Sequence, residues 1–202
     1  MKQQNKIIVV GATSGLGRML AERYIRDGHV VGIVGRRGDK LAEVAKGHSE
    51  VHCLKADVTD ISQIAVHLSA LAGEMGGLDL LVLCSGVGRM KSGFGLRTGV
   101  THSRYQRAWM DGSGGLGFLV FYATRTWTLG RHFIGSRHPW FGSGSCLFRF
   151  QGYQIHYLEA LRQRARISRK RVCVTDVRPG FVRTPLLSHP EKIVLWMSRK
   201  RR

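Results

Sequence analysis

The sequence predicts an α/β fold in which a doubly wound parallel sheet carries helices on both faces. Apolar runs rich in Val and Ile recur along the first 85 residues, and each run ends at a glycine or a polar residue. Segments with apolar residues at helical spacing separate these runs. Buried strands that alternate with helices are typical of a parallel sheet whose two faces are both covered.

The elements can be assigned in order along the chain. Four strands are expected in the first half, at residues 6–10, 30–34, 51–56 and 78–83. Two helices are expected between them, at residues 16–27 and 39–46. A third helix begins at Asp60, which forms a capping-box pattern with Gln63. A further helix is expected from Tyr153, and a further strand at 171–177 ends in a turn that contains Pro179 and Gly180.

A glycine-rich loop with the spacing GxxxGxG joins the first strand to the first helix. Gly11 permits the tight turn, Gly15 lets the backbone approach a phosphate, and Gly17 allows close packing of helix on strand. The helix N-terminus then faces a pyrophosphate, so a dinucleotide is the predicted ligand, and a plain strand–helix turn is the alternative. The residues expected at this ligand are Gly11, Thr13, Ser14, Gly15, Leu16 and Gly17.

This loop, GATSGLG, resembles that of the short-chain dehydrogenase/reductase family. The resemblance continues through Asp57-Val58-Thr59, through Ser85-Gly86 where the family usually has Asn-Ala-Gly, and through the segment from Pro179 to Thr184. It covers residues 1–88 and 153–188. It implies a Rossmann-type fold and an oxidoreductase that moves hydride between a nicotinamide cofactor and a carbonyl or alcohol.

The resemblance also implies roles for individual residues. Asp57 and Val58 would flank the adenine, and Ser85 with Gly86 would line the ribose. Pro179, Gly180 and Thr184 would cup the nicotinamide.

Two arginines after the second strand indicate the form of the cofactor. An NAD-binding site of this kind carries an acid there to hold the ribose 2′-hydroxyl, but this chain has Arg36 and Arg37. Guanidinium groups pair with a 2′-phosphate, so NADP(H) is preferred over NAD(H). A solvated turn is the alternative.

The formal charge of +19 is concentrated in the second half. Residues 1–88 are nearly balanced, whereas residues 89–152 hold nine basic residues and one acid, Asp111. The four cysteines and nine histidines show no metal-ligand spacing, and no apolar run is long enough for a membrane span. A cytoplasmic location without metal is expected. A nucleic-acid arm in the basic half is a less favoured alternative.

The residues that perform the chemistry in the family are absent from their places. The resemblance implies a Tyr-x-x-x-Lys pair near residue 150, with Tyr as general acid/base and Lys lowering its pKa, and a Ser that orients the carbonyl. Tyr153 is instead followed four places later by Tyr157. Residues 89–152 also lack sustained periodicity, so disruption of the fifth strand and of the helix after it is expected.

A shifted reading frame is the hypothesis for this segment and also for the C-terminal tail, residues 197–202. A back-translation of residues 144–152, read one base later, gives Ala-Pro-Ala-Tyr-Ser-Ala-Ser-Lys-Ala, which contains the missing pair. Shifting residues 132–136 and 105–110 gives Ile-Ser-Ser-Val-Ala and Thr-Asn-Val-Arg-Gly-Trp, which resemble the family's Ser and Asn segments. Third bases are free in such a test, but Trp109 and Met110 leave no choice of codon.

One NAD(P)-binding Rossmann domain over residues 1–202 is therefore expected. It comprises an intact cofactor half (1–88), an aberrant segment (89–152), a family-like segment (153–188) and a truncated basic tail (189–202). The expected function is an NADP-dependent oxidoreductase with impaired catalysis, acting on a small carbonyl or alcohol. A non-catalytic NADP-binding protein or a basic nucleic-acid-binding protein is the alternative. The resemblance implies a homo-oligomer in intact relatives, and the expected disruption of the helix that usually helps build that interface counts against one here.

Overall fold

A computed structural model describes residues 3–85, 126–132, 145–169 and 171–177, with side chains for 3–60, 62–85, 155–169 and 171–177. The strands are β1 (Lys6–Val10), β2 (Val30–Gly35), β3 (Val51–Lys55), β4 (Leu80–Leu83), β5 (Thr126–His132) and β6 (Arg171–Val177). The helices are α1 (Gly15–Arg26), α2 (Gly38–Ala45), α3 (Ile61–Glu74) and α6 (Ser145–Ile167).

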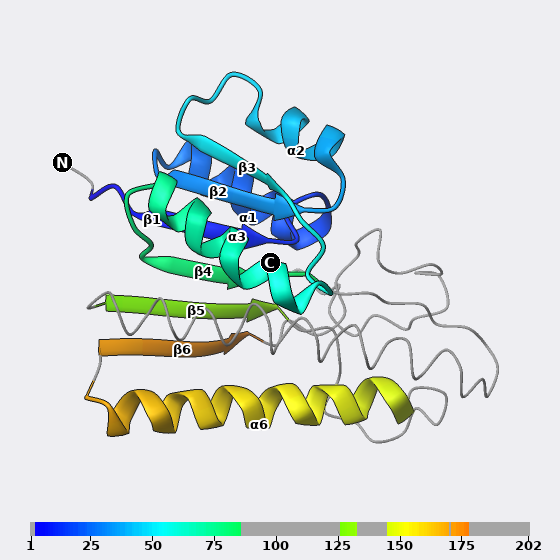
Figure 1. Ribbon diagram of the computed structural model, residues 1–202, viewed down its shortest axis with the longest axis vertical. Coiled ribbons are helices and arrows are strands. Elements are labelled where there is room, and N and C mark those ends of the chain that lie inside the picture. Colours follow the sequence, from blue (N-terminus) through cyan, green and yellow to red (C-terminus); the bar gives the residue numbers. More distant parts are fainter. Residues whose placement is uncertain (1–2, 86–125, 133–144, 170, 178–202) are drawn as a thin grey trace, which may run out of the picture.

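The strands form one parallel sheet in the order β3-β2-β1-β4-β5-β6 (Figure 1). At its centre, Val9 of β1 lies between Ile33 of β2 and Val82 of β4. The chain adds strands outward from β1 to β3, then returns to add β4 on the other side of β1. Because parallel crossovers are right-handed, this reversal places the helices of the two halves on opposite faces. The predicted fold class is confirmed.

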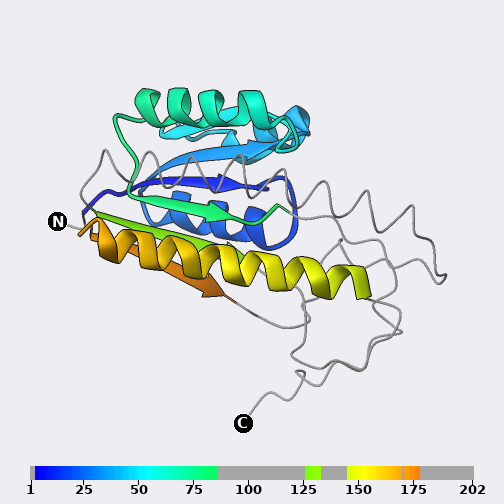
Figure 2. The ribbon, with the colours of Figure 1, turned by 60° about the horizontal axis from the view of Figure 1, so that its bottom comes forward.

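Alternate residues of each central strand supply the cores of the two faces. Ile7 and Val9 lie in a cluster with residues of α1 and α2, whereas Ile8 and Val10 lie in a cluster with residues of α3 and α6. Figure 2 shows α3 and α1 on opposite sides of the sheet. All four strand residues are at most 2% exposed, as expected for a strand covered on both sides.

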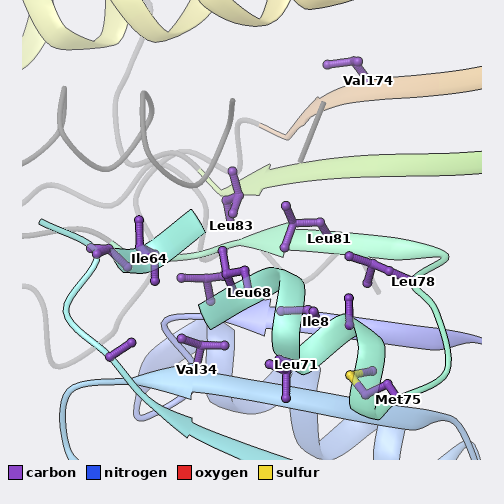
Figure 3. Packing of buried hydrophobic residues seen from close by; sticks show 14 of the residues in the cluster. Ile8, Val34, Ile64, Leu68, Leu71, Met75, Leu78, Leu81, Leu83 and Val174 are labelled. Atoms are coloured by element: carbon purple, nitrogen blue, oxygen red, sulfur yellow. The ribbon is translucent and has the colours of Figure 1, made fainter. Parts of the chain in front are cut away.

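The α3 face shows how this packing works. Leu68 and Leu71 of α3, one turn apart in helical spacing, lie beside Ile8 of β1 in Figure 3. The same cluster extends to Leu158 of α6 and Val174 of β6, so the last helix and strand share a core with the first half. The Asp60 carboxylate accepts a hydrogen bond from the backbone N–H of Gln63, which confirms the predicted cap of α3.

The sheet is more complete than the sequence predicts. The expected disruption of the fifth strand differs from the structure, in which β5 (Thr126–His132) pairs with both β4 and β6. Thr126 to Thr128 are β-branched or aromatic, which favours extended backbone, and the ladder uses backbone groups that these residues all carry. The helix expected from Tyr153 begins earlier, at Ser145. Most of the segment 89–152 lies outside the described residues.

The described helices include none with the length and apolar character that a membrane crossing requires.

Candidate functional site

The glycine loop lies at the carboxyl end of β1, where the order of strands reverses toward β4. Ligands of open α/β sheets bind at this switch point. Gly11 has a φ of +90°, and a Cβ there would lie 2.6 Å from the backbone nitrogen of Ser85, just after β4. Glycine is therefore required for both the turn and the close approach of the two strand ends.

The start of α1 packs directly on this loop. A Cβ on Gly17 would collide with the carbonyl oxygen of Gly11 and would lie 3.0 Å from Cβ of Cys84. The helix can approach the strand ends only because residue 17 has no side chain. This geometry confirms the packing role predicted for Gly17, and it places the N-terminus of α1 at the switch point.

The N-terminus of α1 has no side-chain cap. Ser14 occupies the cap position with extended backbone, but its hydroxyl makes no cap hydrogen bond, and the first turn contains no acidic residue. The first N–H groups of a helix need partners, and the positive end of the helix dipole attracts an anion. The loop therefore presents donors and a positive field suited to a phosphate.

The side chain of Arg37 lies over the same loop. Its Nη2 donates hydrogen bonds to the Thr13 hydroxyl at 2.8 Å and to the Ser14 hydroxyl at 3.0 Å. Arg37 lies just after β2. Its side chain therefore extends from the end of β2 to the loop that follows the neighbouring strand, β1. A positive charge thereby stands at the edge of the predicted phosphate site.

Arg36 points toward the end of β3. Its Nη1 lies 4.0 Å from the Asp57 carboxylate, and both side chains are about half exposed. That carboxylate also accepts hydrogen bonds from the backbone N–H and the hydroxyl of Thr59, which fix its orientation. Val58, just after β3, is 4% exposed, and its side chain packs in the hydrophobic core.

The end of β4 closes the site. The Ser85 hydroxyl oxygen is buried without a hydrogen-bond partner, and a buried polar group without a partner raises the free energy of the folded state. Beside it, burial raises the pKa of the Cys84 thiol to about 12. The unpaired Ser85 hydroxyl is thus a polar group at the switch point that a ligand can satisfy.

The structure brings most of the predicted cofactor residues to one edge of the sheet. Those at the carboxyl ends of β1 to β4 are Gly11, Thr13, Ser14, Gly15, Leu16, Gly17, Arg36, Arg37, Asp57, Val58 and Ser85. Gly86, Pro179, Gly180 and Thr184 lie outside the described residues. Within the part of the chain that is described, no cluster of His, Cys, Asp and Glu could hold a metal ion.

Two residues at this edge were not predicted to act there. A Cβ on Gly35, the last residue of β2, would lie 2.5 Å from the Thr13 methyl group. Cys84 packs against Gly17, as described above. The role of Gly35 could have been inferred from its position at the end of a strand, directly before two arginines. Nothing in the sequence around Cys84 distinguishes it from an ordinary core residue.

The sequence is similar to proteins of one family. The profile described as short chain dehydrogenase matches residues 5–106, just over half of the chain. The glycine betaine reductase ATRR of Emericella nidulans is 39% identical over 85 residues, which are 40% of this chain and 7% of that protein. The NADP-dependent 3-hydroxy acid dehydrogenase YdfG of Shigella flexneri is 32% identical over 82 residues, 40% of this chain and 33% of that enzyme. The match thus spans a third or less of either relative.

Solved structures share the fold over most of the chain. A 3-ketoacyl-(acyl-carrier-protein) reductase from Brucella melitensis, complexed with NADH, superposes with a TM-score of 0.78 at 18% identity, covering 90% of this chain and 78% of that one. The profile match and the geometry of the glycine loop lead to the same assignment. The chain belongs to the short-chain dehydrogenase/reductase family, whose members are NAD(P)-dependent oxidoreductases.

Proposed function

We propose that this chain binds a nicotinamide dinucleotide at the carboxyl edge of β1 to β4 and prefers NADP(H) to NAD(H). The observation that carries the proposal is the Arg37 guanidinium held over the phosphate loop, beside a helix α1 that no side chain caps. The pyrophosphate would take the N–H groups of the loop and of the first turn of α1. The unpaired Ser85 hydroxyl fits a polar ligand at the same place.

The preference for NADP(H) follows from the charges at the end of β2. The two cofactors differ by one phosphate on the adenosine ribose, and this phosphate is stabilised by guanidinium groups and repelled by a carboxylate. Gly35, Arg36 and Arg37 occupy the end of the strand and the turn, with no acid among them. The Asp57 carboxylate lies 4.0 Å from Nη1 of Arg36, so it faces a guanidinium there.

Direct titration tests the preference. We expect NADPH to bind the purified chain at least tenfold more tightly than NADH, measured by cofactor fluorescence or calorimetry. The double variant Arg36→Ala/Arg37→Ala should lose about tenfold or more in NADPH affinity, because hydrogen bonds to charged groups contribute about 1.5–3 kcal/mol each. Arg26→Ala, in the last turn of α1, is the matched control. Equal or tighter binding of NADH by the natural chain would overturn the preference.

We further propose that this chain binds the cofactor without efficient turnover. The cofactor supplies or accepts the hydride, but a proton must be moved at the substrate oxygen, and the family places Tyr, Lys and Ser for that step. In this chain Tyr153 is followed by Tyr157 where Lys is expected, and loss of a general acid/base lowers rates by about 10²–10⁴. We expect no measurable NADPH oxidation across a panel of small carbonyl compounds, and robust turnover would refute this part.

The shifted frame accounts for the missing residues. We propose that residues from within 90–104 to about 152 are translated out of the ancestral frame, since the three shifted segments restore the family's Asn, Ser and Tyr-x-x-x-Lys in order. Resequencing the gene is the test. Codons at residues 144–152 that cannot give Tyr-x-x-x-Lys one base later would contradict the proposal.

A further inference from the structure

We propose that the hydroxyls of Thr13 and Ser14 act as positioning groups that hold Arg37 ready for the 2′-phosphate, so that the phosphate loop itself helps to choose the cofactor. The inference rests on the proposed binding of NADP(H). It assigns to Thr13 and Ser14 a task separate from contact with the pyrophosphate. It also gives Gly35 a part in the same arrangement.

The first observation is the pair of hydrogen bonds from one nitrogen of Arg37. Nη2 donates to both hydroxyls, across 24 and 23 residues of sequence. A guanidinium carries five N–H groups in a fixed plane, so two bonds from Nη2 leave those of Nε and Nη1 to meet an anion. The loop thereby fixes the orientation of an exposed arginine that would otherwise lose side-chain entropy on binding.

The second observation is the contact that orients Thr13. The Thr13 methyl group packs over Gly35. A Cβ added at Gly35 would lie only 2.5 Å from that methyl carbon. A β-branched side chain has few χ1 states, so fixing the methyl group over Gly35 also fixes the direction of the hydroxyl. In this structure that hydroxyl meets Arg37. Gly35 at the end of β2 thus contacts Thr13 in the loop, and Thr13 in turn accepts a hydrogen bond from Arg37, which follows β2.

This contact also explains why residue 35 is glycine. Any side chain at residue 35 would displace the Thr13 methyl group and, with it, the hydroxyl that holds Arg37. The packing of Gly35 against Thr13 therefore helps to hold the Arg37 guanidinium in place. The preference for a 2′-phosphate would be reinforced through Arg37.

The third observation concerns Ser14. A serine at the N-cap position ordinarily accepts a hydrogen bond from an N–H of the first helical turn. The Ser14 hydroxyl accepts from Arg37 instead and caps nothing. The N–H groups of α1 stay available to the pyrophosphate, while the hydroxyl serves the arginine.

The two possible roles of these hydroxyls predict different results. Hydroxyls that bind the pyrophosphate would matter equally for both cofactors, because both carry it. Hydroxyls that position Arg37 would matter only for the cofactor with a 2′-phosphate, and only while Arg37 is present. A double-mutant cycle separates the two cases.

The experiment compares Kd values for NADPH and NADH in four forms: the natural chain, Thr13→Val/Ser14→Ala, Arg37→Ala, and the triple variant. Valine keeps a methyl group over Gly35 and puts a second methyl group in place of the hydroxyl. We expect the Kd for NADPH to rise about three- to tenfold in Thr13→Val/Ser14→Ala, the size of a hydrogen bond's net contribution. The Kd for NADH should stay within about twofold. In the Arg37→Ala background the same changes should have no further effect.

The controls make each outcome decisive. Ser168→Ala removes a hydroxyl that donates to the Arg164 carbonyl at the end of α6, far from the site, and should change neither Kd. Equal weakening of both cofactors, or full loss in the Arg37→Ala background, would overturn the positioning role. The natural chain's own ratio of NADPH to NADH affinity tests the proposed function, and the change of that ratio in Thr13→Val/Ser14→Ala tests this inference.

Discussion

Arg18 of α1 and Glu43 of α2 form an ion pair at 2.8 Å that joins two helices on the same face of the sheet. Arg18 also pairs with Glu22 one turn further along α1, and Lys40 pairs with Glu43 within α2. The pairs make a four-residue network directly beside the loop that begins α1. The network holds the two helices whose N-terminal ends frame the predicted phosphate site.

This network should make the stability of the fold sensitive to acid. The Arg18 guanidinium, and after it the Lys40 ammonium, lower the pKa of Glu43 from its ordinary 4.5 to about 2. A carboxylate whose pKa is lower in the folded chain stabilises the fold above pH 4.5, and this stabilisation is lost as the pH falls toward 2. Thermal melts of Glu43→Gln should show a flatter decline over that range than the natural chain.

The effect should be modest, because the carboxylate is half exposed and solvent screens it. Glu74→Gln, an exposed carboxylate on α3, is the matched control and should keep the natural slope. Identical acid profiles for the natural chain and Glu43→Gln would contradict the network's role.

Replacement of Gly11 by alanine should lower the free energy of unfolding far more than the same replacement at Gly28, which has a similar backbone conformation. Gly11 and Gly28 have φ values of +90° and +83°, but a Cβ on Gly28 meets nothing within 4 Å, whereas one on Gly11 meets the Ser85 backbone at 2.6 Å. We expect Gly28→Ala to lose about 1 kcal/mol from the free energy of unfolding and Gly11→Ala roughly 3 kcal/mol or more. Chemical denaturation measures both, and similar losses would mean that the collision is relieved without cost.

The first four strands could be predicted from the sequence: β1 and β2 are β-branched runs covered on both faces, and β4 is a continuous run of Leu and Val. Their ends lie within two residues of the expected positions. The strand β5 could not be predicted, since Thr126 to His132 show no strong alternation and are held by pairing with neighbours on both sides. Such pairing depends on the tertiary fold rather than on local sequence.

The candidate site divides in the same way. The glycine loop and the two arginines were predictable, because their spacing and charge are local features. The bonds from Arg37 to Thr13 and Ser14 were not, because they join residues more than twenty positions apart. The contact of Gly35 with Thr13 likewise exists only once β1 and β2 lie side by side.

Truncation of Leu68 tests the core beneath α3. Leu68 is 2% exposed and packs among residues from β1 and β4, whereas Val66, on the same helix, is 60% exposed. Leu68→Ala should lower the free energy of unfolding by about 2–5 kcal/mol, since it removes apolar contacts and leaves a cavity. Val66→Ala should change it by less than about 0.5 kcal/mol. Denaturation curves that show equal changes for both would contradict the assigned face of α3.

The Cys84 thiol should resist alkylation in the folded chain. Only the thiolate reacts, and burial at the base of the glycine loop raises the pKa of Cys84 to about 12, so very little thiolate is present at pH 8. Cys53 and Cys173 are exposed, and iodoacetamide should label both while Cys84 stays unmodified, as read by peptide mass spectrometry. In denaturant all three should react alike, which excludes an intrinsic effect of the local sequence. Labelling of Cys84 at the rate of Cys53 in the native chain would show that the packing of Gly17 against the end of β4 opens readily. The phosphate loop would then lack the rigid packing on which its proposed selectivity depends.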